Sequence, residues 1–120
     1  MSSTFAELLA ELVGQIPGAI GAVFLDLEGE AVDQFSHIPL FDILLVGAHW
    51  AIILRIVQEF HDKHSLGSTE VVILNGPEMD IIIKPIDGEY SVILAMKSGN
   101  HLASALTAID KVASEIRAEM

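Results

Sequence analysis

The chain contains no cysteine and few basic residues. Without cysteine it can form no disulfide and offers no thiolate as a metal ligand or nucleophile, although this absence identifies no cellular compartment. Its 6 lysines and arginines stand against 17 aspartates and glutamates, which gives a net charge of −11 with histidine neutral. A charge of this sign disfavours binding to nucleic acid or to anionic lipid, and favours a basic partner.

The sequence also lacks the common catalytic and phosphate-binding motifs. Gly18-x-x-Gly21 precedes a predicted strand, whereas a phosphate-binding glycine loop follows a strand and opens a helix. No serine lies in a nucleophile-elbow motif. We therefore expect a protein that is not an enzyme, with no catalytic residue, cofactor or metal.

Length and hydropathy indicate a single domain, residues 1–120, that buries surface in an oligomer. A chain of 120 residues is long enough for one hydrophobic core. Its hydrophobic content of 52% and mean hydropathy of +0.54 are high for a monomer in water. The N-terminus has no basic region followed by an apolar run, so we expect no signal peptide and a cytoplasmic protein.

The segment Phe41–Phe60 is the most unusual part of the sequence. It contains no proline and reads as one helix. At 100° per residue its large apolar side chains cover roughly 200° of arc, about twice the stripe that a helix needs against one core. A helix this apolar must be covered on more than one side. The large apolar residues are Ile43, Leu45, Val46, Trp50, Ile52, Ile53, Leu54, Ile56, Val57 and Phe60.

A membrane span is the first alternative for this helix. The 20 residues from Ile38 to Val57 are long enough to cross a bilayer. However, the window contains Asp42, His49 and Arg55, and a carboxylate or guanidinium costs about 2.5–3.5 kcal/mol at the centre of a spanning helix. We therefore expect no direct membrane insertion, and favour a partner subunit as the second cover.

The remaining chain alternates short strands and one-faced helices. Asn75-Gly76 and Asp87-Gly88 are two-residue hairpin signals, and Ser98-Gly99-Asn100 is expected to cap the last helix. The tight connections predict a mostly antiparallel sheet of α+β class with helices covering its faces. The expected elements are a helix over 4–16, strands over 19–27 and 30–35, the helix over 41–60, strands over 71–74, 79–86 and 90–96, and a final helix.

Clustered acidic residues occupy the first hairpin. Asp26, Glu28, Glu30 and Asp33 could in principle supply oxygen ligands to a hard cation. Their spacing does not match a calcium-binding loop, and charged residues at a sheet edge discourage unwanted strand pairing. We therefore interpret them as a solvated turn.

Three histidines are candidate site residues. His61 and His64 lie at a helix end without a third ligand nearby in the sequence, so a solvated last turn is favoured over a zinc site. His49 lies within the apolar arc, where a buried imidazole requires a hydrogen-bond partner. It is predicted to be a core or interface residue, not a catalytic one.

Two segments resemble the start of the Roadblock family, which is named after a dynein light chain. Residues 16–23, Ile-Pro-Gly-Ala-Ile-Gly-Ala-Val, resemble its first turn and strand, and residues 25–29, Leu-Asp-Leu-Glu-Gly, resemble the end of that strand. Lys97-Ser98-Gly99-Asn100 is similar to the turn before the family's last helix. The order of elements also matches along nearly the whole chain.

This resemblance implies a five-stranded antiparallel sheet in the order 2-1-5-4-3. The first and last helices would cover one face and the middle helix the other. Family members dimerise by pairing their third strands edge to edge and packing their middle helices together, so a homodimer is expected. The stripe of Leu44, Gly47, Ala48 and Ala51 either allows the two helices to approach closely or forms a partly solvated flank. The implied interface residues are Gly47, Trp50, Ala51, Ile53, Leu54, Val57, Val71 and Ile73.

The resemblance also implies a function, because Roadblock-family proteins act as scaffolds and regulators of Ras-like small GTPases. Bacterial relatives include a GTPase-activating protein of gliding motility. Only Arg55 and Arg117 could serve here as an arginine finger, and neither position looks suited to it. Two alternatives stay open: a ligand-sensing module on a similar single sheet, and a dimerisation domain with no GTPase partner.

Overall fold

The structure is a computed structural model that describes residues 4–99 and 101–120. It contains a five-stranded antiparallel sheet in the order β2-β1-β5-β4-β3, which confirms the predicted α+β class and strand order. The elements are α1 (Thr4–Gln15), β1 (Ala19–Asp26), β2 (Ala31–Ser36), α2 (Leu40–Lys63), β3 (Val72–Asn75), β4 (Met79–Ile86), β5 (Tyr90–Lys97) and α3 (Leu102–Glu119).

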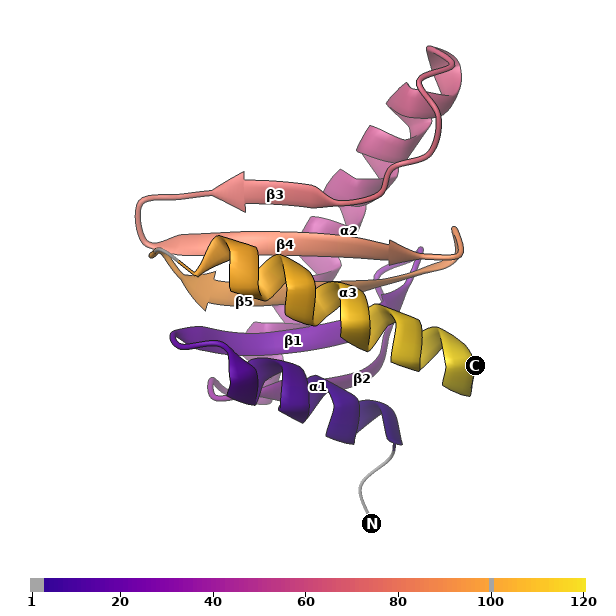
Figure 1. The fold of residues 1–120 in the computed structure, drawn as a ribbon. Coiled ribbons are helices and arrows are strands. Elements are labelled where there is room, and N and C mark those ends of the chain that lie inside the picture. Colours follow the sequence, from indigo (N-terminus) through magenta and orange to yellow (C-terminus); the bar gives the residue numbers. More distant parts are fainter. Residues whose placement is uncertain (1–3, 100) are drawn as a thin grey trace.

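The helices lie on the two faces of the sheet as predicted. α1 and α3 lie side by side on one face, and α2 crosses the other face (Figure 1). α2 starts near β2 and runs diagonally, so that its C-terminal half projects beyond the β3 edge. This projection leaves part of α2 without a sheet of its own chain beneath it.

The strands divide the core into two layers by the ordinary alternation of side chains across a sheet. Phe24 and Leu94 point toward α1 and α3, while their neighbours Val23 and Ile93 point toward α2. On the first face Phe24 is in edge contact with Phe5, with ring centroids 5.1 Å apart. Each face of the sheet therefore has its own packed core, and both depend on the central strands β1 and β5.

Both hairpins predicted to have two-residue loops are longer. Asn75 pairs with Asp80, and residues 76–78 connect β3 to β4, with the Gly76 N–H donating to the Met79 carbonyl at 3.1 Å. Ile86 pairs with Tyr90, which leaves residues 87–89 as the second connection. In that loop Asp87 and Gly88 both adopt positive φ, at 41° and 82°, which glycine tolerates without strain.

The predicted cap of the last helix is wrong. α3 begins after His101, which makes no side-chain capping bond, and Asn100 lies outside the described residues. Ser98 instead fastens the turn after β3: its hydroxyl donates to the Gly76 carbonyl at 2.6 Å and to Asp80 Oδ1 at 3.3 Å. Asp80 is buried, and it also accepts the Gly76 N–H at 3.2 Å. This network holds the end of β5 against the hairpin that leads from the edge strand β3.

Candidate protein-binding surface

The side of α2 that faces its own sheet is built from small and apolar residues. Ile43, Gly47, Ala51 and Leu54 are its buried residues. A Cβ atom placed on Gly47 would lie 2.9 Å from Leu25 Cδ2 and 3.2 Å from Val23 Cγ1, closer than atoms in van der Waals contact. The absence of a side chain at Gly47 therefore lets α2 lie directly on β1.

This contact changes the interpretation of the small-residue stripe. Gly47 and Ala51, expected to admit a sister helix, are used instead for close approach to the chain's own sheet. Ala48 lies over the first hairpin, since a Cβ on Gly29 would lie 3.3 Å from its Cα. Leu54 is likewise buried within the chain. The close approach that these residues allow is therefore between α2 and the sheet of its own chain.

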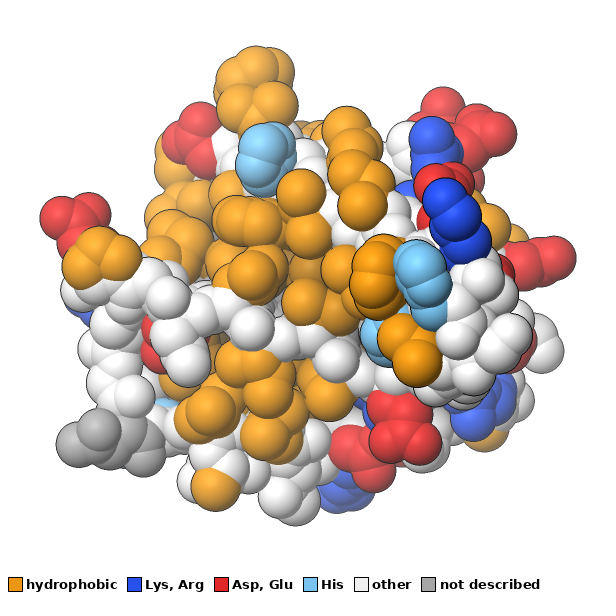
Figure 2. Space-filling view, turned by 90° about the horizontal axis from the view of Figure 1, so that it is seen from above, with side chains coloured by type: hydrophobic (Ala, Val, Ile, Leu, Met, Phe, Trp, Pro, Cys, Tyr) orange, Lys and Arg blue, Asp and Glu red, His pale blue; other side chains and the backbone are white. Residues whose placement is uncertain are grey.

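The opposite side of α2 is also apolar, and it is exposed. Phe41, Leu45, Ile52, Ile56 and Phe60, which we name the outer stripe, are between 55% and 73% exposed. At 100° per residue they fall within about 100° of arc, centred opposite the buried side. Seen from above, onto the end of the molecule where β3 and the projecting half of α2 lie in Figure 1, hydrophobic side chains gather across the middle and charged ones lie mostly toward the margins (Figure 2). A contiguous exposed apolar patch of this kind marks an interaction site.

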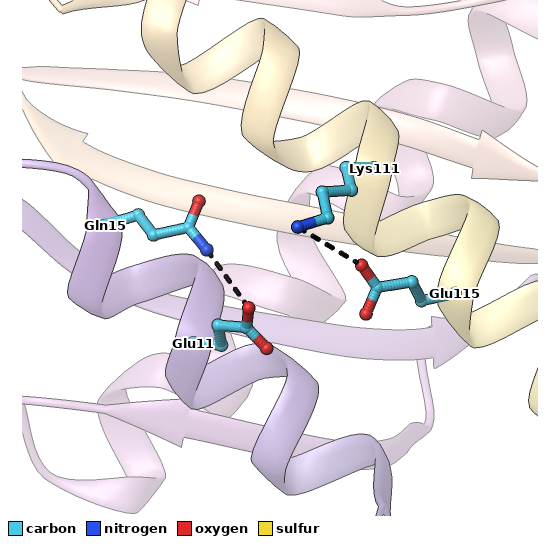
Figure 3. Close-up of polar contacts among 4 residues, drawn as sticks. All are labelled: Glu11, Gln15, Lys111 and Glu115. Carbon is cyan, nitrogen blue, oxygen red and sulfur yellow. Dashed lines mark hydrogen bonds and ion pairs between the residues drawn. The ribbon is translucent and has the colours of Figure 1, made fainter.

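The other two helices show what an ordinary outer surface looks like in this protein. On α1, Gln15 donates to Glu11 at 3.4 Å, and on α3, Lys111 Nζ lies 3.9 Å from Glu115 Oε1 (Figure 3). These polar contacts lie on the surface of the helix layer, above the buried residues of the same helices. The outer side of α2 differs from those of α1 and α3, because large exposed apolar side chains predominate on it.

The flanks of α2 carry the remaining residues of the predicted interface. Trp50, Ile53 and Val57 are half-buried between the sheet-facing side and the outer stripe. His49 is exposed, and its ring meets the Trp50 ring edge-on with centroids 5.0 Å apart. His49 is therefore not a core residue of the single chain, and its interface role stays a prediction.

Strand β3 lies at one edge of the sheet and pairs with β4 alone in the topology of the described chain. Val71, just before the strand, is 37% exposed, and Ile73 is half-buried. An open edge of this kind presents unpaired backbone groups that can bond to another strand. The projecting half of α2 lies beyond this same edge (Figure 1), so edge and helix form one continuous region.

By length and composition, α2 is also the one helix within residues 4–99 and 101–120 that could cross a membrane. Its mean hydropathy reaches 2.0 over the most apolar 18-residue window, of which 22% is buried within the chain. The helix contains Asp42 and Arg55, and Glu59, Asp62 and Lys63 follow near its end. The expectation that it does not insert into a membrane stays a prediction.

The two arginines considered as fingers line one surface cleft. Arg55 comes from α2 and Arg117 from α3, so the cleft joins the two faces of the sheet around the β4–β5 hairpin. Lys84 lines it as well, but its Nζ is paired with Asp110 Oδ1 at 3.2 Å. The cleft has a volume of about 620 Å³, and carboxylates such as Glu59 also line it. It is mixed in charge and open to solvent.

The acidic hairpin and the histidine-containing helix end are each held by hydrogen bonds within the chain. Asp26 Oδ1 accepts the N–H groups of Glu28 and Glu30 at 2.9 and 3.1 Å, which stabilises the turn itself. His61 Nδ1 lies 2.9 Å from the Thr69 hydroxyl, and this hydrogen bond ties the end of α2 to the loop before β3. Among the residues described, no three metal-ligating side chains come together.

Comparison with known proteins identifies the fold. No family model and no curated protein sequence matches the chain. Among solved structures, a Roadblock/LC7 domain from Streptomyces avermitilis superposes with a TM-score of 0.89 over 98% of both chains. The fold is that of the Roadblock/LC7 domains. The two sequences are 12% identical, so the likeness is in the fold.

Two further structures share the Roadblock/LC7 fold. Myxococcus xanthus MglB is 11% identical, with a TM-score of 0.82 over 96% of this chain and 95% of that one. MglC from the same organism is 19% identical, with a TM-score of 0.70 over 95% of this chain and 97% of that one. The resemblance inferred from residues 16–29 and from the order of elements is confirmed at the level of the fold.

The predicted interface omitted the most exposed part of α2. The predicted interface contained none of the outer-stripe residues, although the apolar arc predicted from the sequence included four of the five. The signal that separates the two sides is the position of Gly47 and Ala51 on one line of the helix, because small residues mark the side of closest packing. The set of interface residues itself stays a prediction.

Proposed function

We propose that the chain is a homodimeric, non-catalytic protein that binds a Ras-like small GTPase and regulates its nucleotide cycle. The observation that carries the proposal is the outer stripe of α2, an exposed apolar surface opposite the side that packs on the sheet. The sequence resemblance supplies the class of partner. The Roadblock/LC7 fold supports that resemblance, and a structure called gliding protein MglB from Thermus thermophilus has the same fold.

The proposed dimer joins two copies at the β3 edges. Antiparallel pairing there would extend the sheet across both subunits and satisfy the open edge. The half of α2 that projects beyond the β3 edge (Figure 1) would then lie over the sister sheet. Trp50, Ile53 and Val57 on its flank would meet the sister helix, with Val71 and Ile73 beside the paired edges. This arrangement would depend on the sheet-facing residues of α2, which hold the helix on its own sheet: Gly47, Ala51 and Leu54.

The outer stripe is not covered in such a dimer. Two subunits with a continuous sheet lie side by side, so their middle helices contact each other through their flanks. The side of each helix that points away from the sheet stays open, which leaves Phe41, Leu45, Ile52, Ile56 and Phe60 for a third protein. The net charge of −11 per chain would steer a partner with a basic contact surface.

Regulation in this proposal does not use an arginine finger. Arg55 and Arg117 line a lateral cleft together with carboxylates, and neither belongs to the outer stripe. A dimer docked through the stripe could accelerate hydrolysis by holding the GTPase's own catalytic residues in place, or could act as a scaffold. Arg55→Ala and Arg117→Ala are therefore expected to leave any stimulation of GTP hydrolysis unchanged within about twofold, where loss of a finger costs about 10³-fold or more.

The direct test is binding to Ras-like GTPases encoded in the same genome. We expect wild-type protein to bind a GTPase loaded with a non-hydrolysable GTP analogue at least tenfold more tightly than the GDP-loaded form, measured by isothermal titration calorimetry. Ile56→Glu should reduce this affinity at least tenfold, because it places a charge in the apolar contact. Leu66→Glu is the matched control: Leu66 is 59% exposed, close to the 58% of Ile56, but lies outside the stripe.

Two results would count against this proposal. If no Ras-like GTPase of the genome binds in either nucleotide state, the chain is better described as a dimerisation domain alone. If Ile56→Glu and Leu66→Glu lose affinity equally, the outer stripe is not the docking surface. The ligand-sensing alternative gains no support from the cleft lined by Arg55 and Arg117, which is open and lined largely by polar side chains instead of being a closed apolar pocket.

We also propose a cytoplasmic protein whose α2 stays out of the bilayer. The charged residues of α2 and the acidic excess of the chain support this. In a flotation assay with liposomes containing about 20% anionic lipid, wild-type protein should remain in the bottom fraction. Its recovery with floating liposomes, retained at high salt, would show insertion of the apolar helix instead.

A further inference from the structure

We infer that the proposed dimer has a second docking site, on the face of the sheet that carries α1 and α3, where a single helix of a partner protein covers the two β3 strands. The inference rests on the dimer proposed above, but not on the identity of any GTPase. Its occupant is an amphipathic helix with a narrow apolar stripe and basic flanks. Two chains together bind one such helix.

Strand β3 is left without a helix over it on the face of α1 and α3. α1 packs on β1 and β2, while α3 packs on β4 and β5, so each of these helices covers two strands. β3 lies beyond α3, with no helix in front of it (Figure 1). On this face the sheet therefore extends one strand further than its helix layer.

The uncovered part of this face is apolar. Ile73 pairs with Ile82, and Ile82 belongs to the buried core beneath α1 and α3, so both side chains point to that face. Ile82 is fully buried, whereas Ile73 is half-buried and belongs to neither core of the described chain. Val71, two residues earlier, is 37% exposed and lines a groove against Leu106 of α3. Apolar side chains therefore continue past α3 with no layer above them.

This groove, which we name the β3 groove, has a volume of about 400 Å³. On its α3 wall the Thr107 hydroxyl donates to the Ala103 carbonyl at 3.2 Å, so this donor is used within the helix. Lys84 Nζ and Asp110 Oδ1 are paired at 3.2 Å, with the Lys84 side chain 21% exposed and that of Asp110 70% exposed. The more exposed charge is negative, which favours a partner with basic flanks. The β3 groove is lined by Val71, Lys84, Leu106, Thr107, Ile109 and Asp110.

Dimerisation would give the uncovered face the width of one helix. Antiparallel pairing of the two β3 edges places two uncovered strands between the α3 helices of the two subunits. Two strands occupy about 9.6 Å, and packed helices lie about 8–10 Å apart. One helix therefore fits between the two α3 helices, in the proportion of one helix to two strands that α1 and α3 already show. This position lies on the two-fold axis of the dimer, so one helix occupies it for every two chains.

The β3 groove and the outer stripe lie on different faces of the sheet. α3 forms a wall of the groove on one face, and α2 lies on the other (Figure 1). A GTPase on the outer stripe and a helix over the β3 strands would therefore not compete for the same surface. The dimer would then act as a scaffold that joins the GTPase to the protein from which the helix comes.

Isothermal titration calorimetry with a panel of helical peptides tests this site without any GTPase. Each peptide has about 18 residues, a length of about 27 Å as a helix, with a leucine, isoleucine or phenylalanine stripe and lysine flanks. We expect at least one to bind with one peptide for two chains, at least tenfold more tightly than its glutamate-flanked counterpart.

Sedimentation of the same samples separates failure of the site from failure of the dimer. No binding by a protein that sediments as a dimer, or one peptide bound by each chain, would overturn the inference and leave the proposed function intact. A protein that sediments as a single chain would contradict the proposed dimer, and with it the two-strand site.

Two arginine variants of α3 locate the bound peptide. Thr107 and Ser104 are both exposed on this helix, and arginine adds one positive charge at either position, but only Thr107 lines the β3 groove. Thr107→Arg should weaken binding of the lysine-flanked peptide at least tenfold, and Ser104→Arg by no more than about twofold, both with unchanged circular dichroism spectra. Equal losses would overturn the inference. So would binding that is lost in Ile56→Glu and kept in Thr107→Arg, because the peptide would then lie on the outer stripe.

Discussion

Gly47→Leu is expected to lower the free energy of unfolding by about 3 kcal/mol, at the upper end of the range for overpacked cores. Even a Cβ at this position would lie 2.9 Å from Leu25 Cδ2 and 3.3 Å from Val23 Cβ, and both of those residues are buried. The larger side chain must therefore push α2 away from β1. The change is measured by urea denaturation at one fixed protein concentration, because the stability of a dimer depends on concentration.

Gly14→Leu is the matched control for this effect. Gly14 lies in α1, is exposed, and has no heavy atom within 4 Å of the position that a Cβ would occupy. Since leucine favours a helix over glycine by roughly 0.5–1 kcal/mol, this variant should be as stable as the wild type or slightly more so. Equal losses at both glycines would mean that α2 does not lie on β1 as the structure shows.

Phe24→Ala is expected to have a still larger effect, a loss of about 4 kcal/mol. Phe24 is 1% exposed on the central strand β1, and its ring meets Phe5 at 5.1 Å and Tyr90 at 5.5 Å between centroids. Removing it leaves a cavity between the sheet and the pair α1 and α3, and ends two aromatic contacts. With a total stability of roughly 5–15 kcal/mol for a domain, such a loss should be evident as a much lower Tm.

The comparison for Phe24→Ala is Val32→Ala, on the edge strand β2. Val32 is 48% exposed and lies outside both buried cores, so its truncation should change the free energy of unfolding by no more than about 0.5 kcal/mol. Differential scanning calorimetry of the two variants and the wild type measures both losses of stability. A loss at Phe24 no larger than that at Val32 would be inconsistent with a packed core between β1 and the two helices.

Much of the fold could be predicted from local patterns because they agree with the tertiary structure. Proline and glycine at 17–18 mark the end of α1, and alternating or continuous apolar runs give all five strands within one or two residues. The order of the strands came from the family resemblance, since hairpin signals alone do not say that β1 pairs with β5. The fold was therefore predictable only when local and family information were combined.

The predictions that failed concern residues whose partners are distant in the sequence. Asn75-Gly76 resembles a two-residue turn, but the connection spans residues 76–78, and the Gly76 backbone is hydrogen-bonded to Asp80 and Ser98. Ser98 is thereby unavailable as a helix cap. A local pattern cannot indicate that a hydroxyl is used 22 residues away.

The candidate surface was only partly predictable, again because it depends on contacts between residues that are distant in the sequence. The apolar arc of α2 shows that two sides need cover, but a helix that is apolar almost all round does not indicate which side faces its sheet. Only the packing of Gly47 on Leu25 and Val23 determines that orientation, and with it the exposure of the outer stripe. The predicted interface therefore included buried residues such as Leu54 and omitted Ile52 and Ile56.

The central claim is that the outer stripe of α2 is a surface for proteins, and carbene footprinting tests it most directly. The wild-type chain is labelled alone at low concentration and again with a saturating GTP-analogue-loaded GTPase, and labelling is read residue by residue across α2. We predict that Phe41, Leu45, Ile52, Ile56 and Phe60 lose most of their labelling in the complex, while Leu66 and Val32 keep theirs. Unchanged labelling of the stripe in a complex that demonstrably forms would contradict the account.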